Sequence, residues 1–227
     1  FLKMKKHLSI ILLCLITTSC LEILDDITFN IDGSGTFKYT VNLSSSQVKL
    51  NSILALDSID GKKVPSVNEI QVKIEVFAAS LSTQEGISNV YIDTNYQQFI
   101  FKIQCDFSNV MNLQRGFELF LIETMSKLEN EEIAYDWITW DGTGMVRKVP
   151  DLDNWSLPSI KTEDSELLKK GYYTSITRFE NRVNYFENPA AKLSKNERAV
   201  MLRKSAFEVF NDHKVMDNII HVDSTTN

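Results

Sequence analysis

The chain has 227 residues, of which 24 are lysine or arginine and 30 are aspartate or glutamate, so its formal net charge at pH 7 is −6. A chain this acidic repels a phosphate backbone, which argues against a nucleic-acid-binding protein. Hydrophobic residues make up 43% of the chain and include 13 phenylalanines, which excludes a disordered stalk. The length suits one sizeable domain or two small ones.

The first residues have the three-part layout of a secretory signal. Lysines precede an almost wholly apolar run from Leu8 to Ile16, and small polar residues follow up to Ser19. The apolar run is shorter than the about 20 residues that a helix needs to cross a bilayer, which disfavours a permanent transmembrane helix. We therefore expect residues 1–19 to be a signal peptide that is removed on export.

The segment LITTSC, which ends at Cys20, resembles the bacterial lipobox. In that family diacylglycerol is attached to the cysteine thiol, and the signal is cut directly before the cysteine. The resemblance implies that Cys20 is lipidated, that cleavage falls between Ser19 and Cys20, and that residues 20–26 form a lipidated N-terminus and linker. Two or three acyl chains hold a protein stably on a membrane. The alternative is a plain secretory signal with a chance cysteine near its end.

Residues 27–128 predict two pairs of strands and three helices. Apolar and polar residues alternate on both sides of Asp32-Gly33-Ser34-Gly35, which indicates a β-hairpin whose glycines supply positive φ. A helix is expected over residues 44–56, and a second over 66–86, where Ser66 and Glu69 form a capping box. Strands over 89–95 and 97–107 and a helix over 109–128 follow.

Residues 129–222 are richer in strands. A hairpin is expected on both sides of Asp141-Gly142-Thr143-Gly144, followed by an irregular loop over 150–158. Strands are expected over 172–183, 197–205 and 217–222, with a short helical turn over 205–211 and a frayed tail over 223–227. We therefore predict an α+β fold in which an antiparallel sheet carries helices on one face, and a strand-rich C-terminal part continues the same domain.

The cysteines and histidines do not form a metal-binding pattern. Cys14 leaves with the signal, and Cys105 lies on one apolar face of a predicted strand, which indicates a buried small hydrophobe rather than a catalytic thiol. His213 and His221 are eight residues apart and lack the tighter spacing of zinc ligands. No nucleophile elbow, P-loop or dinucleotide-binding motif is present. We expect neither enzymatic activity nor a cofactor nor a metal.

Three tryptophans, Trp137, Trp140 and Trp155, lie close together in the sequence. They could line a cleft that binds a sugar or a lipid, and we name them as candidate ligand-binding residues. Since Trp137 and Trp140 point to opposite faces of the predicted strand, core packing is the favoured alternative.

Two stretches carry a further resemblance, ITFNIDGSGTFKYTVNL and EGISNVYIDTNYQQFIFKIQCDF with the helix after it. They resemble uncharacterised envelope lipoproteins of Bacteroidetes and, more distantly, the LppM-like domain of envelope lipoproteins. The LppM-like resemblance implies a lipid-interacting protein. The motifs are structural rather than catalytic.

We predict a non-enzymatic lipoprotein of the cell envelope that acts as a binding or assembly module. It is held to a membrane by its N-terminal lipid, and its partner is an envelope protein or a lipid or glycan ligand. Leu21 after the anchor is not the aspartate that retains lipoproteins at the inner membrane, which favours the outer membrane. Two alternatives stay open: a lipid or glycan carrier with an apolar cleft, and an unrecognised hydrolase.

Overall fold

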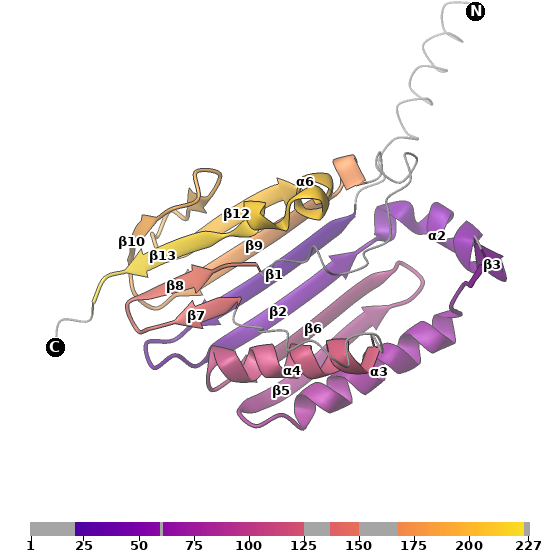
Figure 1. Cartoon of the computed structure of the whole chain (residues 1–227), viewed down its shortest axis with the longest axis horizontal. Coiled ribbons are helices and arrows are strands. Elements are labelled where there is room, and N and C mark those ends of the chain that lie inside the picture. The colour runs from indigo at the N-terminus through magenta and orange to yellow at the C-terminus, as the bar shows by residue number, and fades with distance from the viewer. Residues whose placement is uncertain (1–20, 60, 125–136, 150–167, 225–227) are drawn as a thin grey trace, which may run out of the picture.

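The computed structural model of the chain describes residues 21–59, 61–124, 137–149 and 168–224. Within these ranges the larger sheet has seven strands in the order β11-β12-β9-β1-β2-β6-β5 (Figure 1). Its strands are β1 (Glu22–Phe29), β2 (Gly35–Asn42), β5 (Ile87–Asn95), β6 (Ile100–Phe107), β9 (Tyr172–Phe179), β11 (Lys192–Leu193) and β12 (Ala199–Ser205).

A smaller sheet has four strands in the order β10-β13-β8-β7 among the same described residues. Its strands are β7 (Ile138–Trp140), β8 (Gly144–Arg147), β10 (Val183–Phe186) and β13 (Asn218–Val222). A separate pair of two-residue strands, β3 (Ser58–Ile59) and β4 (Lys62–Lys63), follows the first helix.

Apart from η2, which the sequence pattern does not predict, the helices begin and end close to where the pattern places them. They are η1 (Ser44–Ser46), α2 (Gln47–Leu54), α3 (Val67–Ser82), α4 (Val110–Thr124), α6 (Ala206–Asn211) and η2 (His213–Met216). The capping box of α3 is present: the Glu69 backbone N–H donates to the Ser66 hydroxyl, and the Ser66 backbone N–H donates to the Glu69 carboxylate. The last turn predicted for α4, residues 125–128, lies outside the described residues.

The smaller sheet, α3 and α4 cover one face of the larger sheet (Figure 1). Side chains on that face come from alternate positions of the strands, and they form one buried core with the helices. Phe29 at its centre packs against Trp140, Phe107 and Phe179, with ring centroids 5.1 to 5.9 Å apart. Gln114 of α4 joins the helix to β7, because its amide exchanges two 2.8 Å hydrogen bonds with the backbone of Ile138.

The predicted α+β class with a mostly antiparallel sheet is confirmed, with one difference in strand direction. β1 pairs antiparallel with β2 and parallel with β9. An alternating sequence pattern reports which residues face the core, but it carries no information on the direction of the neighbouring strand. The smaller sheet, which shares the covered face with the helices, is the second feature that the sequence pattern does not contain.

The predicted linker over residues 20–26 is wrong for Glu22 to Asp26, which form the first half of β1. Ile23, Asp25 and Ile27 occupy alternate positions of this strand, and Asp25 is buried. The acidic residues gave the stretch the composition of a linker, whereas hydrogen bonding to both β2 and β9 makes it a central strand. The folded domain therefore begins at once after Leu21.

Both Asp-Gly-x-Gly segments form hairpin turns, and their two glycines act differently. Gly33 and Gly142 have φ of +85° and +91°, as expected for tight turns. Gly35 instead begins β2, where a Cβ would lie 1.9 Å from the Thr28 backbone oxygen. Gly144 begins β8, where a Cβ would lie 2.7 Å from the Ile220 backbone oxygen. The second glycine of each turn thus permits close approach of a neighbouring strand rather than positive φ.

Candidate functional site

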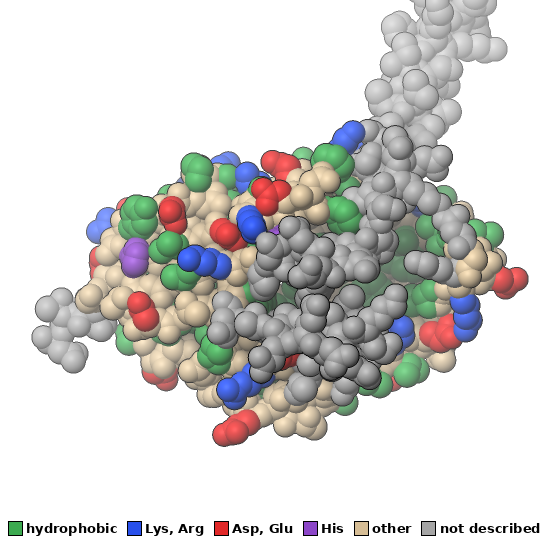
Figure 2. Space-filling view, viewed as in Figure 1, with side chains coloured by type: hydrophobic (Ala, Val, Ile, Leu, Met, Phe, Trp, Pro, Cys, Tyr) green, Lys and Arg blue, Asp and Glu red, His purple; other side chains and the backbone are tan. Residues whose placement is uncertain are grey.

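An apolar pocket of about 130 Å3 opens on the covered face of the larger sheet, between α3 and the strands β2, β5 and β6. Figure 2 shows this face hollowed between α2 and α3, with hydrophobic side chains on the floor of the hollow. The pocket is lined by Tyr39, Val41, Ile74, Phe77, Thr94, Phe101, Lys102 and Ile103. Pockets that hold drug-sized ligands measure about 300–1,000 Å3, so this one suits a smaller apolar group.

The pocket is apolar because the strands beneath it place aromatic and aliphatic side chains on the face that α3 covers. Tyr39 pairs with Ile103 across β2 and β6, and Val41 pairs with Phe101, so aromatic and aliphatic side chains alternate onto one face. Burial, and then the charge of Asp25, raises the pKa of Tyr39 to about 12. Its phenol is therefore protonated at neutral pH and adds no charge to the pocket.

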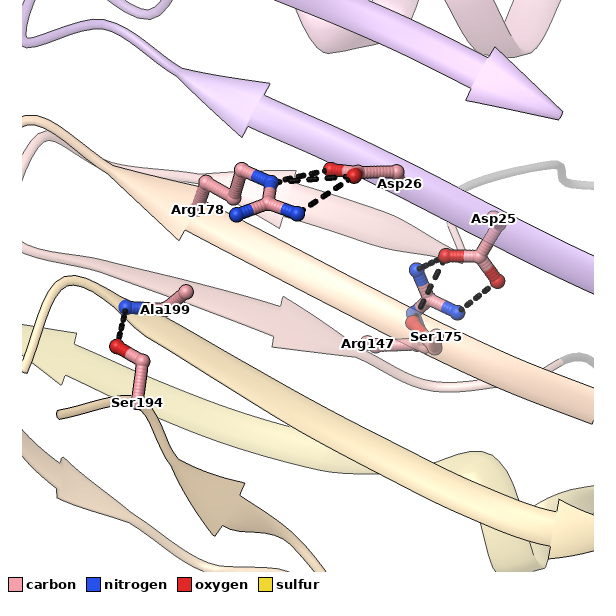
Figure 3. A network of polar contacts seen from close by, with 7 residues as sticks. All are labelled: Asp25, Asp26, Arg147, Ser175, Arg178, Ser194 and Ala199. Carbon is pink, nitrogen blue, oxygen red and sulfur yellow. Dashed lines mark hydrogen bonds and ion pairs between the residues drawn. The ribbon is translucent and has the colours of Figure 1, made fainter.

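A buried polar cluster lies next to the pocket and joins the two sheets (Figure 3). The Arg147 guanidinium donates from two nitrogens to the two carboxylate oxygens of Asp25, each over 3.0 Å. The Tyr173 hydroxyl donates to the same carboxylate over 2.7 Å, and the Ser175 hydroxyl over 2.8 Å. The side chains of Asp25 and Arg147 are 2% and 4% exposed.

This cluster is built as a cross-link. The Asp25 carboxylate receives four hydrogen bonds, which leaves little acceptor capacity for a substrate. Burial, and then the charge of Asp25, raises the pKa of Tyr173 well above its ordinary value, so this phenol also holds its proton. Arg147 comes from β8 and its partners from β1 and β9, so the cluster ties the smaller sheet to the larger one.

The neighbouring Asp26 faces the opposite side of the sheet (Figure 3). Its carboxylate accepts from the Arg178 guanidinium over 2.8 to 3.1 Å, at a partly exposed site. The two adjacent aspartates therefore serve different faces of β1, one in the core and one at the surface.

The residues proposed from the sequence lie apart from the pocket or outside the described part of the chain. Ser19, Cys20 and Trp155 lie outside the described residues. Trp140 is half-buried and stacks on Phe29 in the aromatic core, with centroids 5.1 Å apart. The ring of Trp137 lies 5.6 Å from the Arg147 guanidinium carbon, beside the polar cluster.

Cys105 is a buried free cysteine, as its position on an apolar strand face indicates. Burial, and then the nearby charge of Asp106, raises the pKa of its thiol to about 12, which keeps the thiolate scarce at neutral pH. Across the residues that the structure describes, no group of three or more histidine, cysteine, aspartate or glutamate side chains is arranged to hold a metal ion. His221 packs its ring against Tyr185, with centroids 5.8 Å apart.

Sequence reasoning missed the polar cluster, although a signal for it exists. Asp25 occupies an inward position in the alternation of Ile23, Ile27 and Phe29, and an acid at such a register requires a buried partner. Arg147 occupies an inward position of β8 in the same way. The alternation therefore identifies both charges, but their pairing depends on the packing of two sheets.

The fold and site define a mixed α+β domain of two sheets with an apolar pocket and a buried ionic cross-link. No helix among the described residues has the length and apolar character that crossing a membrane requires. No family model matches the chain, and no curated protein matches it. A solved structure, the folded domain of the Mycobacterium tuberculosis LppM protein determined by NMR, aligns with a TM-score of 0.38 and 12% sequence identity over 91% of this chain and 92% of that chain.

Proposed function

We propose that the protein is a lipoprotein of the bacterial cell envelope, held to a membrane through Cys20, whose domain acts as a binding or assembly module. The proposed lipid anchor is supported by the order of the N-terminal segments. A stretch with the layout of a signal peptide is followed by a lipobox-like cysteine and then by a core strand that begins at Glu22. A lipid on Cys20 would hold the domain directly against the membrane surface, since one residue separates the two.

A binding role is supported by apolar side chains on the surface of α3. Val72 and Val76 are one helical turn apart and are 48% and 51% exposed. They point away from the face of α3 on which Phe77 and Leu81 pack into the core. Neighbouring exposed aliphatic side chains on one helix face offer an apolar surface on which another protein can pack. The proposal assigns this face to an envelope protein partner.

A binding role also fits the chemistry of the buried charges. A general acid or base must reach its substrate and change its protonation state, but Asp25 is saturated by four donors and shielded by the core. The proposal therefore gives this cluster a structural role and gives the domain no hydrolytic activity. Because Leu21 follows the anchor, the outer membrane is the proposed location.

The anchor is tested by fractionation of cells that express the chain and its Cys20→Ser variant. We expect the unsubstituted protein in the membrane fraction, resistant to high salt and released by detergent. The variant is expected to leave that fraction. If both proteins sediment with membranes to the same extent, the anchor is not the lipid on Cys20.

The binding surface is tested by a photo-crosslinking amino acid at Val76 in cells. We expect one discrete crosslinked product, which the added substitution Val72→Asp abolishes because it places a charge in the contact. The matched control places the crosslinker at Lys195, an exposed turn residue far from α3. Equal products from the two positions, or none from Val76, would argue against a partner on α3.

A carrier of a lipid or glycan is the second candidate, and the apolar lining of the pocket favours it. Tyr39, Phe77 and Phe101 could pack against part of an acyl chain. The substitution Ile103→Trp would fill the pocket, and a carrier should then lose the lipids that co-purify with the unsubstituted protein from its own membranes. A lipid content that is unchanged by this substitution would remove the carrier from consideration.

A further inference from the structure

We propose that the end of the domain next to the anchor docks on anionic phospholipid headgroups, through a basic groove on one side of Leu21 and exposed aliphatic residues of the segment from α2 to β3 on the other. This inference rests on the proposed lipid anchor at Cys20. It adds an orientation, since a lipidated residue alone leaves a domain free to tilt on the membrane.

The basic groove lies at the edge of the larger sheet, beyond the end of the short strand β11. It has a volume of about 450 Å3. Four cations and one carboxylate line it: Lys169, Lys192, Arg203, Lys204 and Glu208. The groove is therefore strongly positive in a chain whose net charge is −6. Such a local excess attracts anions at physiological ionic strength.

Three of the four cations contact neighbouring side chains. The Arg203 guanidinium lies 4.0 Å above the ring of Tyr172, and the ammonium of Lys169 lies 5.4 Å from the ring of Phe207. Lys204 lies 3.9 Å from the Glu208 carboxylate, at the start of α6. Lys192 and Arg203 are exposed. Phosphate oxygens can therefore reach both of these groups from solvent.

The groove is next to the point where the chain enters the domain. The Tyr172 backbone N–H donates to the Leu21 carbonyl oxygen over 2.7 Å, and Tyr172 pairs with Glu22 and with Ser205. Consecutive Cα atoms are about 3.8 Å apart, so the residue that bears the lipid lies within a few ångströms of Leu21. The headgroups around the lipid anchor are the anions nearest to the groove.

On the other side of Leu21, the same end of the sheet carries exposed apolar residues. Glu22 pairs with Asn42, the last residue of β2, and η1 and α2 follow. Val48 is 82% exposed, Leu56 is 50% exposed, and Ile59 of β3 is 38% exposed. In Figure 1 the start of β1 lies between α6 and α2, along the upper edge of the view. Aliphatic side chains beside cations match the interfacial zone of a membrane, where both headgroups and acyl chains are within reach.

The test uses the mature protein purified from its own membranes, with a polarity-sensitive fluorophore on the substitution Val48→Cys. Cys105 is buried and does not compete for the label. The protein is added to vesicles of phosphatidylcholine alone and to vesicles that also contain phosphatidylglycerol. We expect a blue shift of the fluorophore and its quenching by brominated lipid only with phosphatidylglycerol, and we expect both to weaken in high salt.

The double variant Lys192→Glu/Arg203→Glu should require at least about tenfold more phosphatidylglycerol for the same blue shift. The reason is that each basic residue near an anionic surface raises the affinity for the membrane about fivefold. The matched control is Lys195→Glu/Arg198→Glu, which changes the net charge equally at exposed positions at the opposite end of the sheet, and it should behave as the unsubstituted protein. Circular dichroism checks that both variants are folded.

Sedimentation in the same experiment separates the two proposals. Loss of the protein from phosphatidylcholine vesicles would show that the anchor fails, while the fluorophore still reports docking on phosphatidylglycerol vesicles. A blue shift of equal size on both kinds of vesicle, or equal behaviour of the two double variants, would overturn the docking inference and leave the anchor untouched.

Discussion

At the scale of single residues, the pair of Asp25 and Arg147 is the feature with the largest expected effect on stability. Removal of one partner leaves the other as a buried charge without its counter-ion, which costs about 3–5 kcal/mol. We therefore expect Asp25→Ala or Arg147→Ala to lower the free energy of unfolding by that amount, as measured by urea denaturation. The double variant Asp25→Leu/Arg147→Met should be more stable than either single variant, because it leaves no unpaired charge. A double variant that is no more stable than either single variant would contradict the cross-link.

Tyr39 makes the stability depend on pH in the alkaline range. Its pKa is raised from 10.0 to about 12 in the folded protein, so above pH 10 the unfolded chain binds fewer protons than the folded one. The stability that the protonated phenol contributes is fully present below pH 10 and is lost as the pH rises toward 12.

We expect the free energy of unfolding to fall in this range by up to about 1.4 kcal/mol per pH unit for each such tyrosine. Tyr39→Phe should reduce this slope, as measured by urea denaturation at several pH values. Tyr91→Phe, at a tyrosine that is 64% exposed, is the matched control and should leave it unchanged. Equal slopes for the two variants would show that Tyr39 is not the group that titrates.

At the scale of elements, α3 depends on its capping box. Ser66→Ala removes the acceptor for the Glu69 backbone N–H and should destabilise the protein by about 1 kcal/mol. Ser66→Asp keeps an acceptor at the same position and should retain most of the stability. Thermal unfolding measures both. A melting temperature for Ser66→Ala equal to that of Ser66→Asp would mean that the cap contributes nothing.

The elements themselves could be predicted from local signals. The capping box of Ser66 and Glu69 and the turn at Gly33 each depend on residues that are close together in the sequence. Both features lie where the sequence pattern places them. The error at Glu22 to Asp26 has a local cause as well. Two adjacent aspartates suggest a segment that is exposed to solvent. In the structure, Asp25 and Asp26 instead face opposite sides of a central strand, and each has a basic partner far away in the sequence.

At the scale of the whole molecule, the arrangement of the elements could not be predicted. The parallel pairing of β1 with β9 joins residues about 150 positions apart, as in the contact of Ser175 with Asp25. The pocket and the basic groove arise in the same way, since Tyr39 and Phe77, or Lys192 and Tyr172, come together only after the sheet is assembled. Local periodicity contains none of these pairings.

The membrane attachment proposed for the whole molecule depends on the covalent state of the first residue after the signal. Mass spectrometry of the protein purified from bacterial membranes measures that state directly, through the intact mass and the N-terminal peptide. We expect a mature chain that begins at Cys20 and carries diacylglycerol on its thiol. A chain that begins elsewhere, or an unmodified Cys20 thiol in a protein that sediments with the membrane, would contradict the account.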